Sequence, residues 1–145
     1  MFTFPWSLSN ILPSCILLFW NIFSSDFADP SLPPERLNLR IEGEAKKHVG
    51  DTAGWYFRQN RFCHRYPYWR IDSKKYSMWF DINSGNWKIG LSTDLGTDRA
   101  VIIGPVCKDM WPQNIADKWM YGNSQVKDFI DAGKNVQSER GVVEK

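Results

Sequence analysis

The sequence predicts an all-β fold, a small antiparallel meander or sandwich of about six strands with low helix content. Aromatic residues make up 15% of the 145 residues and include 8 Trp, and such side chains favour strands. Runs of aromatic and β-branched residues also alternate with turn residues at intervals of roughly ten. In the middle of the chain these runs sort their apolar side chains onto one face, as a half-buried strand requires.

The composition excludes several classes of protein. With 43% hydrophobic and 23% charged residues, the chain is expected to fold as one compact domain with tails. A net charge of +2 gives no reason to expect a polyanionic partner, so nucleic acid is not the expected ligand. Three Cys are too few for a disulfide-rich scaffold, and their spacing does not suit a zinc site.

Residues 1–28 resemble a secretory signal peptide. They contain no Lys or Arg, and the apolar run Ile11–Phe23 is too short to cross a bilayer but suits the hydrophobic region of a signal. Small residues at Ser24, Ser25 and Ala28 offer a cleavage site. We therefore expect a secreted, extracellular protein with no stable membrane insertion after cleavage. The alternatives are an uncleaved anchor or a wrongly assigned start, and without a signal peptide the protein would be cytoplasmic.

The rest of the chain divides into a linker, a domain and a tail. Residues 29–35 are rich in Pro and predict an extended linker, because Pro disfavours helix in the residue before it. Residues 36–131 are the predicted aromatic-rich β domain. Residues 132–145 are polar and have no hydrophobic period, which predicts a disordered tail.

Five strands are predicted within the domain, together with two weaker candidates. The five are Gly54–Arg58, Tyr66–Ile71, Tyr76–Asp81, Asn86–Leu91 and Arg99–Ile103, and the two are Lys118–Tyr121 and Val126–Ile130. Pro112 and the segment Ile115–Lys118 are also compatible with a single helical turn.

The three central strands have a predicted register. Four-residue hairpin loops at 72–75 and 82–85 would set it. The predicted pairs are Ile71 with Tyr76, Trp69 with Met78, Pro67 with Phe80, Tyr76 with Leu91, Met78 with Ile89, and Phe80 with Trp87. Period-two alternation then places all of these side chains on one apolar face, which is the predicted core.

The opposite face of these strands is the candidate ligand-binding surface. It carries Tyr66, Tyr68, Arg70, Ser77, Trp79, Asp81, Asn86 and Lys88. Tyr68, Trp79 and Lys88 fall in one row across three strands, with Arg70 beside Tyr68. Aromatic rings flanked by cations stack on sugars or bases, so these four residues are predicted to bind a ligand if the face is open. If a second layer covers the face, the same aromatics belong to the core.

A basic stretch overlaps this surface. Residues 58–75 contain six Lys or Arg and one acid, with aromatic residues between them. This composition is typical of a groove for single-stranded nucleic acid. It is equally typical of a solvated edge whose cations prevent strands from pairing with other chains.

Cys63 and Cys107 lie outside the signal-like segment. In an oxidising compartment the two are predicted to form a disulfide. In the cytosol they would instead be free, half-buried thiols.

No catalytic set is found. The two His, His48 and His64, do not form a metal-binding pair, and Cys63 and His64 would point to opposite faces of a strand. The Asp94–Asp98 loop lacks the ligand pattern of an EF-hand. No phosphate-binding loop or nucleophile elbow is present. We therefore expect a non-enzymatic protein without catalytic residues, metal or cofactor.

Short aromatic motifs follow one another through the middle of the chain. They are Trp55-Tyr56, Tyr66-Pro67-Tyr68-Trp69, Met78-Trp79-Phe80, Asn86-Trp87-Lys88-Ile89-Gly90, Gly104-Pro105, Trp111-Pro112 and Trp119-Met120-Tyr121. Their order resembles an aromatic-rich β module of invertebrate and protist multidomain proteins, with the pattern GxY, GRPxY, LYY, WxIG, P and WxY. The chain departs from this pattern at Arg65, where the module has a Gly-Arg pair before the Pro. The resemblance implies no catalytic residue and no particular compartment.

These observations predict a secreted, non-enzymatic binding or protein-interaction domain. Its partner would be an unidentified protein or a glycan. The alternative is a glycan- or nucleic-acid-binding module that uses an exposed aromatic and basic sheet face. A third possibility is a structural appendage whose partner is another chain.

Overall fold

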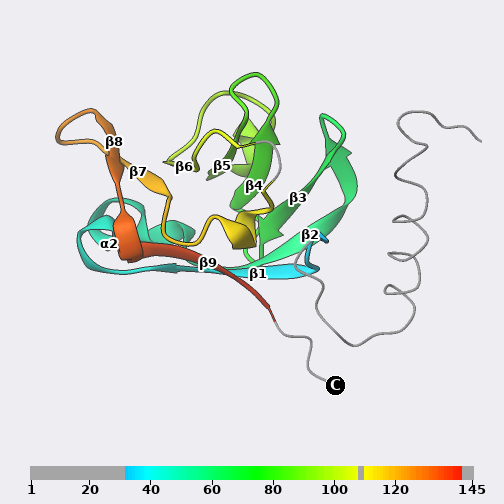
Figure 1. Ribbon diagram of the computed structural model, residues 1–145, viewed down its shortest axis with the longest axis horizontal. Helices are drawn as coiled ribbons and strands as arrows, with labels where there is room; N and C mark the ends of the chain where they lie inside the picture. Colours follow the sequence, from blue (N-terminus) through cyan, green and yellow to red (C-terminus); the bar gives the residue numbers. More distant parts are fainter. Residues whose placement is uncertain (1–31, 108–109, 142–145) are drawn as a thin grey trace, which may run out of the picture. The chain divides into compact units, whose positions relative to one another are not determined.

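A computed structural model of the protein describes residues 32–107 and 110–141. The fold lies in a unit that spans Pro33–Lys145, and its nine antiparallel strands form one curled sheet in the order β8-β7-β6-β5-β4-β3-β2-β1-β9 (Figure 1). The elements are β1 (Arg36–Ile41), α2 (Gly43–Val49), η1 (Gly50–Thr52), β2 (Gly54–Cys63), β3 (Tyr66–Ile71), β4 (Tyr76–Asp81), β5 (Asn86–Leu91), η2 (Ser92–Asp94), β6 (Ile102–Ile103), η3 (Pro112–Asn114), β7 (Met120–Asn123), β8 (Asp128–Asp131), η4 (Gly133–Asn135) and β9 (Val136–Arg140). The fold is predominantly β, as predicted, but it is a single sheet with more strands than the six or so expected.

The central meander is the part that the sequence predicted best. β3, β4 and β5 have the predicted bounds. Their ladders pair Trp69 with Met78, Met78 with Ile89, and Phe80 with Trp87, as predicted. This register places Trp69, Met78, Phe80, Trp87 and Ile89 together on one apolar face, and a shift of one residue would divide them between the two faces.

The Tyr66 end of β3 departs from the prediction. The β3–β4 ladder comprises Trp69 with Met78 and Arg70 with Ser77, so it includes neither of the predicted pairs Pro67 with Phe80 and Ile71 with Tyr76. The Pro67 nitrogen has no hydrogen to donate. Tyr66 was expected on the candidate ligand face. Its ring instead stacks on the core residue Phe80, with 4.4 Å between ring centroids.

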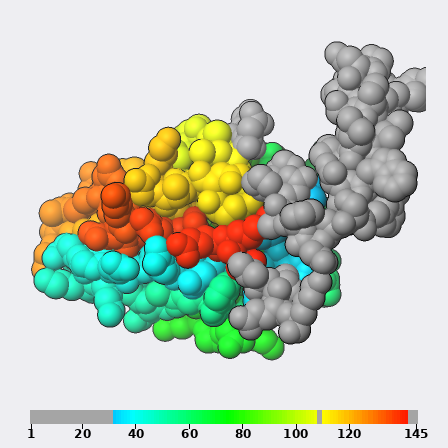
Figure 2. All heavy atoms as spheres, turned by 60° about the horizontal axis from the view of Figure 1, so that its bottom comes forward, coloured from blue at the N-terminus to red at the C-terminus, as the bar shows by residue number. Residues whose placement is uncertain are grey.

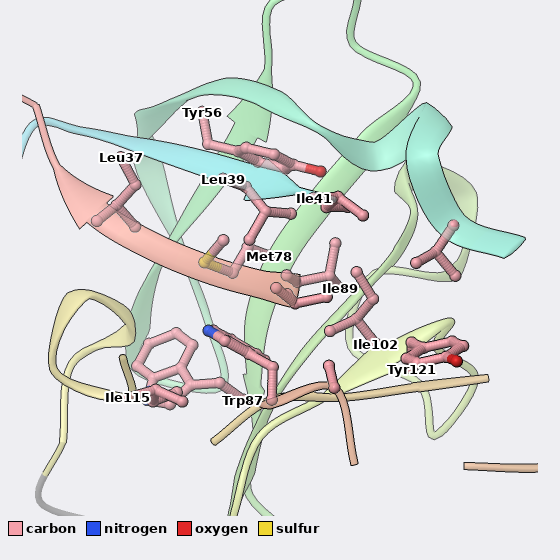
Figure 3. Packing of buried hydrophobic residues seen from close by; sticks show 14 of the residues in the cluster. Leu37, Leu39, Ile41, Tyr56, Met78, Trp87, Ile89, Ile102, Ile115 and Tyr121 are labelled. Atoms are coloured by element: carbon pink, nitrogen blue, oxygen red, sulfur yellow. The ribbon is translucent and has the colours of Figure 1, made fainter. Parts of the chain in front are cut away.

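One apolar core lies within the curl of the sheet (Figure 3). Strands β1 to β7, strand β9 and helix α2 all contribute to it. Three of its Trp side chains also satisfy their buried indole N–H groups, as buried Trp normally does. Trp69 donates to the Pro34 carbonyl at 2.9 Å, Trp87 to the Met110 carbonyl at 2.6 Å, and Trp119 to Ser138 Oγ at 3.0 Å. Each of these bonds fastens a loop or an edge strand to the core.

The start of the domain contains two elements that were not predicted from the sequence. In β1, Leu37, Leu39 and Ile41 alternate inward and are buried. In α2, Ala45 and Val49 are buried four residues apart, which places both on the same helix face. Both segments are short and rich in charged residues, so their apolar periods are brief.

The C-terminal segment corrects the predicted tail. Residues 132–145 were expected to be disordered, but β9 pairs with β1 from Leu37 opposite Arg140 to Ile41 opposite Val136. Val136 is the only apolar residue of β9, so the segment has no hydrophobic period that would predict a strand. Ser138 occupies the other fully inward position and is buried with its hydroxyl hydrogen-bonded to Pro112.

The predicted linker is partly fixed to the domain. Arg58 Nη1 donates to the Pro33 carbonyl at 2.7 Å, and the Arg58 backbone N–H donates to the Glu35 carbonyl at 2.8 Å. The chain is therefore anchored to β2 from Pro33 onward. The predicted signal peptide, residues 1–28, lies outside the described residues, as do residues 142–145.

Candidate functional site

The sheet brings the predicted ligand residues together. Trp79 lies opposite Lys88 in the β4–β5 ladder, and Tyr68 packs in one cluster with Trp79 and Cys63. Arg70 lies opposite Ser77, on the same face as Tyr68. The predicted row across three strands therefore exists as an arrangement of side chains.

The row is covered, however, by residues 92–100, which we call the cover loop. Leu95 packs on the cluster, Trp79 Nε1 donates to the Thr97 carbonyl at 3.3 Å, and Lys88 Nζ donates to the Asp98 carbonyl at 3.3 Å. Tyr68 is 5% exposed, Trp79 0% and Lys88 6%. With the cover loop in this position these three side chains cannot contact a ligand, and only Arg70 is partly exposed.

Gly96 allows the cover loop to approach the sheet. Its φ of +84° lies in the left-handed region that favours glycine. A Cβ atom there would also lie 3.2 Å from His64 Nε2 and 3.3 Å from Cys63 Sγ. A side chain at this position would therefore strain the backbone and push the loop away from the sheet.

Lys88 and Asp81 form a buried ion pair beneath the cover loop. Lys88 Nζ lies 2.6 Å from Asp81 Oδ2. Burial by itself would raise the pKa of Asp81, but hydrogen bonds from Lys88, Ser84 and the Asn83 backbone outweigh it and lower that pKa below its ordinary value. Lys88 therefore neutralises a buried carboxylate, and it is not free to bind an external group.

The predicted disulfide is not formed, because Cys63 and Cys107 are both free thiols. Cys63 ends β2, whereas the Cys107 backbone N–H donates to the Gly85 carbonyl in the turn that leads into β5. Strands β3 and β4 stand between β2 and β5 in the sheet. Neighbouring strands are about 4.8 Å apart, and β2 and β5 are three such steps apart. The separation of these two strands therefore exceeds the Cα–Cα distance of about 7 Å that a disulfide can bridge. Burial raises the pKa of the Cys63 thiol.

An open aromatic surface does exist on the sheet, at different residues. We call Arg36, Trp55, Phe57 and Arg70 the outer strip. Arg36 lies opposite Phe57 and Phe57 lies opposite Arg70, so two cations flank one ring across three strands. The Arg36 guanidinium lies 5.1 Å from the centroid of the Trp55 ring. Trp55 is 40% exposed and Phe57 38%.

A concave site lies where α2, the β7–β8 hairpin and the segment before β6 meet. We call it the α2–β8 pocket. Its volume is about 540 Å³. Ten residues line it: His48, Val49, Ala100, Val101, Gly122, Asn123, Ser124, Lys127, Asp128 and Phe129. Pockets that hold small ligands usually measure about 300–1,000 Å³ and combine apolar walls with a few polar groups.

Gly122 lines this pocket beside two of its walls. Its backbone N–H donates to the Val101 carbonyl at 2.8 Å, which fixes β7 beside the segment before β6. A Cβ atom at Gly122 would lie 3.5 Å from that carbonyl oxygen and 3.7 Å from Phe129 Cε1, which is ordinary contact. A larger side chain at this position would therefore occupy space beside two of the pocket walls.

The β7–β8 turn positions the polar side of the pocket. The Gln125 backbone N–H donates to Asn123 Oδ1 at 2.9 Å, and the Lys127 backbone N–H donates to the Asn123 carbonyl at 2.8 Å. Asn, whose side chain bonds to its own backbone two residues on, is a favoured turn residue. The side chains of Ser124 and Lys127 make no hydrogen bond or ion pair with any residue that the structure describes.

His48 forms the opposite wall. Its ring stacks on Tyr121, with 5.7 Å between centroids and 26° between planes. Its side chain is 10% exposed, and Nε2 lies 3.5 Å from Glu44 Oε2 without a hydrogen bond to any described residue. Hydrogen bonding to Lys47 lowers the pKa of Glu44, so Glu44 is ionised beside this ring at neutral pH.

This pocket was not predicted from the sequence, in which His48 is notable only as one of two His that form no metal-binding pair and Val126–Ile130 only as a candidate strand. The lining residues come from three segments separated by about fifty and about twenty residues. No local motif joins them, so the pocket follows from the curl of the sheet and from the position of α2.

Several classes of site are not found in the described part of the chain. Among residues 32–107 and 110–141, no group of three or more His, Cys, Asp and Glu is placed to hold a metal ion. No described helix combines the length and the apolar character needed to cross a membrane. Comparisons with protein-family models, curated proteins and solved structures yield no match to this chain. The resemblance to the aromatic-rich β module therefore remains a prediction.

Proposed function

We propose that the unit Pro33–Lys145 is a non-enzymatic binding domain that holds its ligand in the α2–β8 pocket. The observation that carries this proposal is that polar side chains without a described partner lie beside apolar walls in the same pocket. The side chains of Ser124 and Lys127 form no hydrogen bond or ion pair with a described residue, while Val49, Val101 and Phe129 supply apolar walls. Uncommitted polar groups beside apolar surface are what a ligand site needs to fix the orientation of its occupant.

The non-enzymatic interpretation rests on the neighbours of His48. A nucleophile is normally activated by hydrogen bonding to a base that a third group orients. In the described part of the chain, no hydrogen bond joins His48 to a hydroxyl or thiol. His48 Nε2 lies 3.5 Å from Glu44 Oε2, which belongs to a carboxylate on the same helix.

A pocket-filling variant tests the proposal. Gly122→Val adds a β-branched residue to β7, where such residues are favoured, and its methyl groups would occupy the pocket. Val126→Leu is the matched control, because Val126 is 58% exposed in the same hairpin and does not line the pocket. Saturation-transfer NMR with a library of small fragments is the measurement, using the full chain.

We expect a set of fragments to bind the natural protein and Val126→Leu, and not Gly122→Val. Thermal unfolding of all three proteins checks that the fold is intact. The proposal fails if no fragment binds the natural protein. It also fails if the fragments bind Gly122→Val equally well.

The outer strip supports a second candidate, a glycan site on an open aromatic and basic face. Its supporting observation is the exposed Trp55 ring with a cation over it. Trp55→Ala should remove this binding, since a stacked aromatic supplies about 1–3 kcal/mol of affinity. Binding to an immobilised glycan panel that Trp55→Ala abolishes and Gly122→Val preserves would favour this candidate over the pocket.

A further inference from the structure

The two edges of the sheet differ in how they are protected. β9 ends one side of the sheet and β8 ends the other. The edge of β9 is packed against η3, where Ser138 Oγ donates to the Pro112 carbonyl, and Figure 2 shows β9 (red) lying between this segment (yellow) and β1 (cyan). No described strand pairs with the outer edge of β8. Natural proteins usually cover or blunt such edges, because an open edge is a template for another strand.

The open edge of β8 directs specific backbone groups outward. In an antiparallel ladder, alternate residues direct both their N–H and their C=O toward one neighbour. The Ala132 N–H donates to the Trp119 carbonyl at 3.0 Å, on the β7 side. The alternation therefore directs the backbone groups of Phe129 and Asp131 away from β7. The Phe129 N–H already donates to Asp128 Oδ1 at 2.7 Å. The Phe129 carbonyl and the backbone N–H and C=O of Asp131 therefore remain to pair with an added strand.

The open edge and the pocket adjoin each other. Asp128 and Phe129 belong to β8 and also line the α2–β8 pocket. A chain that paired with β8 would therefore run past the pocket. Successive side chains of a strand point to opposite faces, so one side chain of such a chain could enter the pocket while its neighbours point away.

The charges on β8 favour a basic partner. The side chains of Asp128 and Asp131 bond only to the backbone N–H groups of Phe129 and Gly133. Neither carboxylate forms an ion pair with a described residue. Lys127 is the adjacent cation, in the turn at one end of the strand. A partner with Lys or Arg beside Asp131 would gain an opposite charge and avoid the repulsion that an acidic partner would meet.

We propose that β8 binds an extended basic peptide segment of a partner protein by strand addition, and that one apolar side chain of the segment enters the α2–β8 pocket. This inference rests on the proposed function, because it names the partner class of the same pocket. Backbone pairing would supply affinity and the pocket would supply specificity, as in other cases of strand addition.

Fluorescence anisotropy with the full chain and a labelled peptide tests the inference. The probe is acetyl-Lys-Thr-Leu-Thr-Ser-amide, with Leu for the pocket and Lys on the same face, opposite Asp131 in an antiparallel pairing. When Leu lies opposite Phe129, the Leu amide faces β8 and the Thr amides face solvent. We expect N-methylation of the Leu amide to weaken binding about tenfold, and N-methylation of a Thr amide to change it little.

Variants of the protein separate the contribution of the charge from that of the pocket. Gly122→Val should weaken binding about tenfold or more, since the Leu side chain loses its site. Asp131→Asn keeps the acceptor for the Gly133 N–H, and should weaken binding several-fold and reduce its salt dependence. Val126→Leu should bind as the natural protein does.

The strand-addition inference is overturned if the peptide does not bind, if a Glu-for-Lys peptide binds equally well, or if both N-methylated peptides bind alike. Fragment binding that Gly122→Val removes, without any peptide binding, overturns this inference and leaves the proposed function standing. Binding of glucose, galactose or N-acetylglucosamine in the pocket, without peptide binding, would also overturn the strand-addition inference and would identify a glycan as the ligand. Absence of both fragment and peptide binding overturns both proposals.

Discussion

At the scale of the single residue, the stability of a Trp79 variant tests whether the cover loop packs on the folded domain. Its ring is 0% exposed, so we expect Trp79→Ala to lower the free energy of unfolding by about 3–5 kcal/mol, as Trp87→Ala should on the other face. Phe62→Ala is the control, since Phe62 is 69% exposed and a surface change typically costs under about 0.5 kcal/mol. Urea denaturation measures all three. A loss at Trp79 as small as that at Phe62 would show that the face is open.

The buried pair Lys88 and Asp81 makes a prediction about pH. The pKa of Asp81 is lowered in the folded state, so its carboxylate stabilises the fold above the ordinary Asp pKa of about 3.9. That contribution disappears as the pH falls through the lowered folded value. We compare the natural protein with the double variant Asp81→Asn, Lys88→Met, which leaves no buried charge unpaired.

The unfolding free energy of the natural protein relative to this variant should fall as the pH is lowered from about 5 to about 2. Urea denaturation across that range is the measurement. A difference that does not change with pH would mean that Asp81 titrates alike in the folded and unfolded states.

The face on which each side chain of the central strands lies was largely predictable, whereas the covering of one face by a loop was not. Alternation placed Tyr68, Trp79 and Lys88 on one face, and the structure does so. Residues 92–98 of the cover loop are largely polar and have no strand pattern, and the predicted strand Arg99–Ile103 is confined to Ile102–Ile103 in the structure. The packing of this loop over Trp79 depends in part on backbone carbonyls such as that of Thr97. Backbone acceptors carry no side-chain signal in a sequence.

At the scale of the element, β9 should be essential to the fold. It covers the Leu37–Ile41 side of β1 and supplies Ser138, which accepts a hydrogen bond from the buried Trp119 indole. A chain ended after Ala132 loses this strand and leaves the indole N–H without its partner, which alone costs about 1–3 kcal/mol. We expect the shortened chain to lack near-UV circular dichroism and a cooperative urea transition. Retention of both with an unchanged midpoint would restore the view that this segment is a tail.

Elements with a strong local pattern were predicted, and those that depend on distant partners were not. The β3 to β5 strands have dense aromatic alternation and defined hairpin loops. β9 has one apolar residue and pairs with β1, nearly one hundred residues earlier in the chain. A pairing over that distance is specified by the partner strand and the core, so local pattern alone does not reveal it.

At the scale of the whole molecule, the N-terminal segment predicts secretion. The uncharged apolar run Ile11–Phe23 followed by small residues suits a cleaved signal. Protein expressed in eukaryotic cells should appear in the medium and begin between Asp26 and Ser31, which mass spectrometry of the intact chain would show. Recovery of a chain that begins at Met1 from the cytosol would contradict secretion. The binding proposals do not depend on this result.

The candidate site belongs to the whole molecule, and for that reason the sequence did not reveal it. The sequence predicted an aromatic row that the fold covers. The pocket instead joins α2, the segment before β6 and the β7–β8 hairpin, which meet only when the sheet curls. Gly122 is the one local hint, since a Gly inside a strand can mark a site where another group approaches closely.

Binding at the α2–β8 pocket is tested most directly by ¹H–¹⁵N correlation spectra of the full chain, titrated with the fragment library. We predict shifts of the backbone amides of Val49, Val101, Gly122 and Phe129, and no shifts in the Gly122→Val variant. The amides of Trp55 and Phe57 in the outer strip should not move. Shifts confined to the outer strip, or pocket shifts that persist in Gly122→Val, would contradict a ligand site in the pocket.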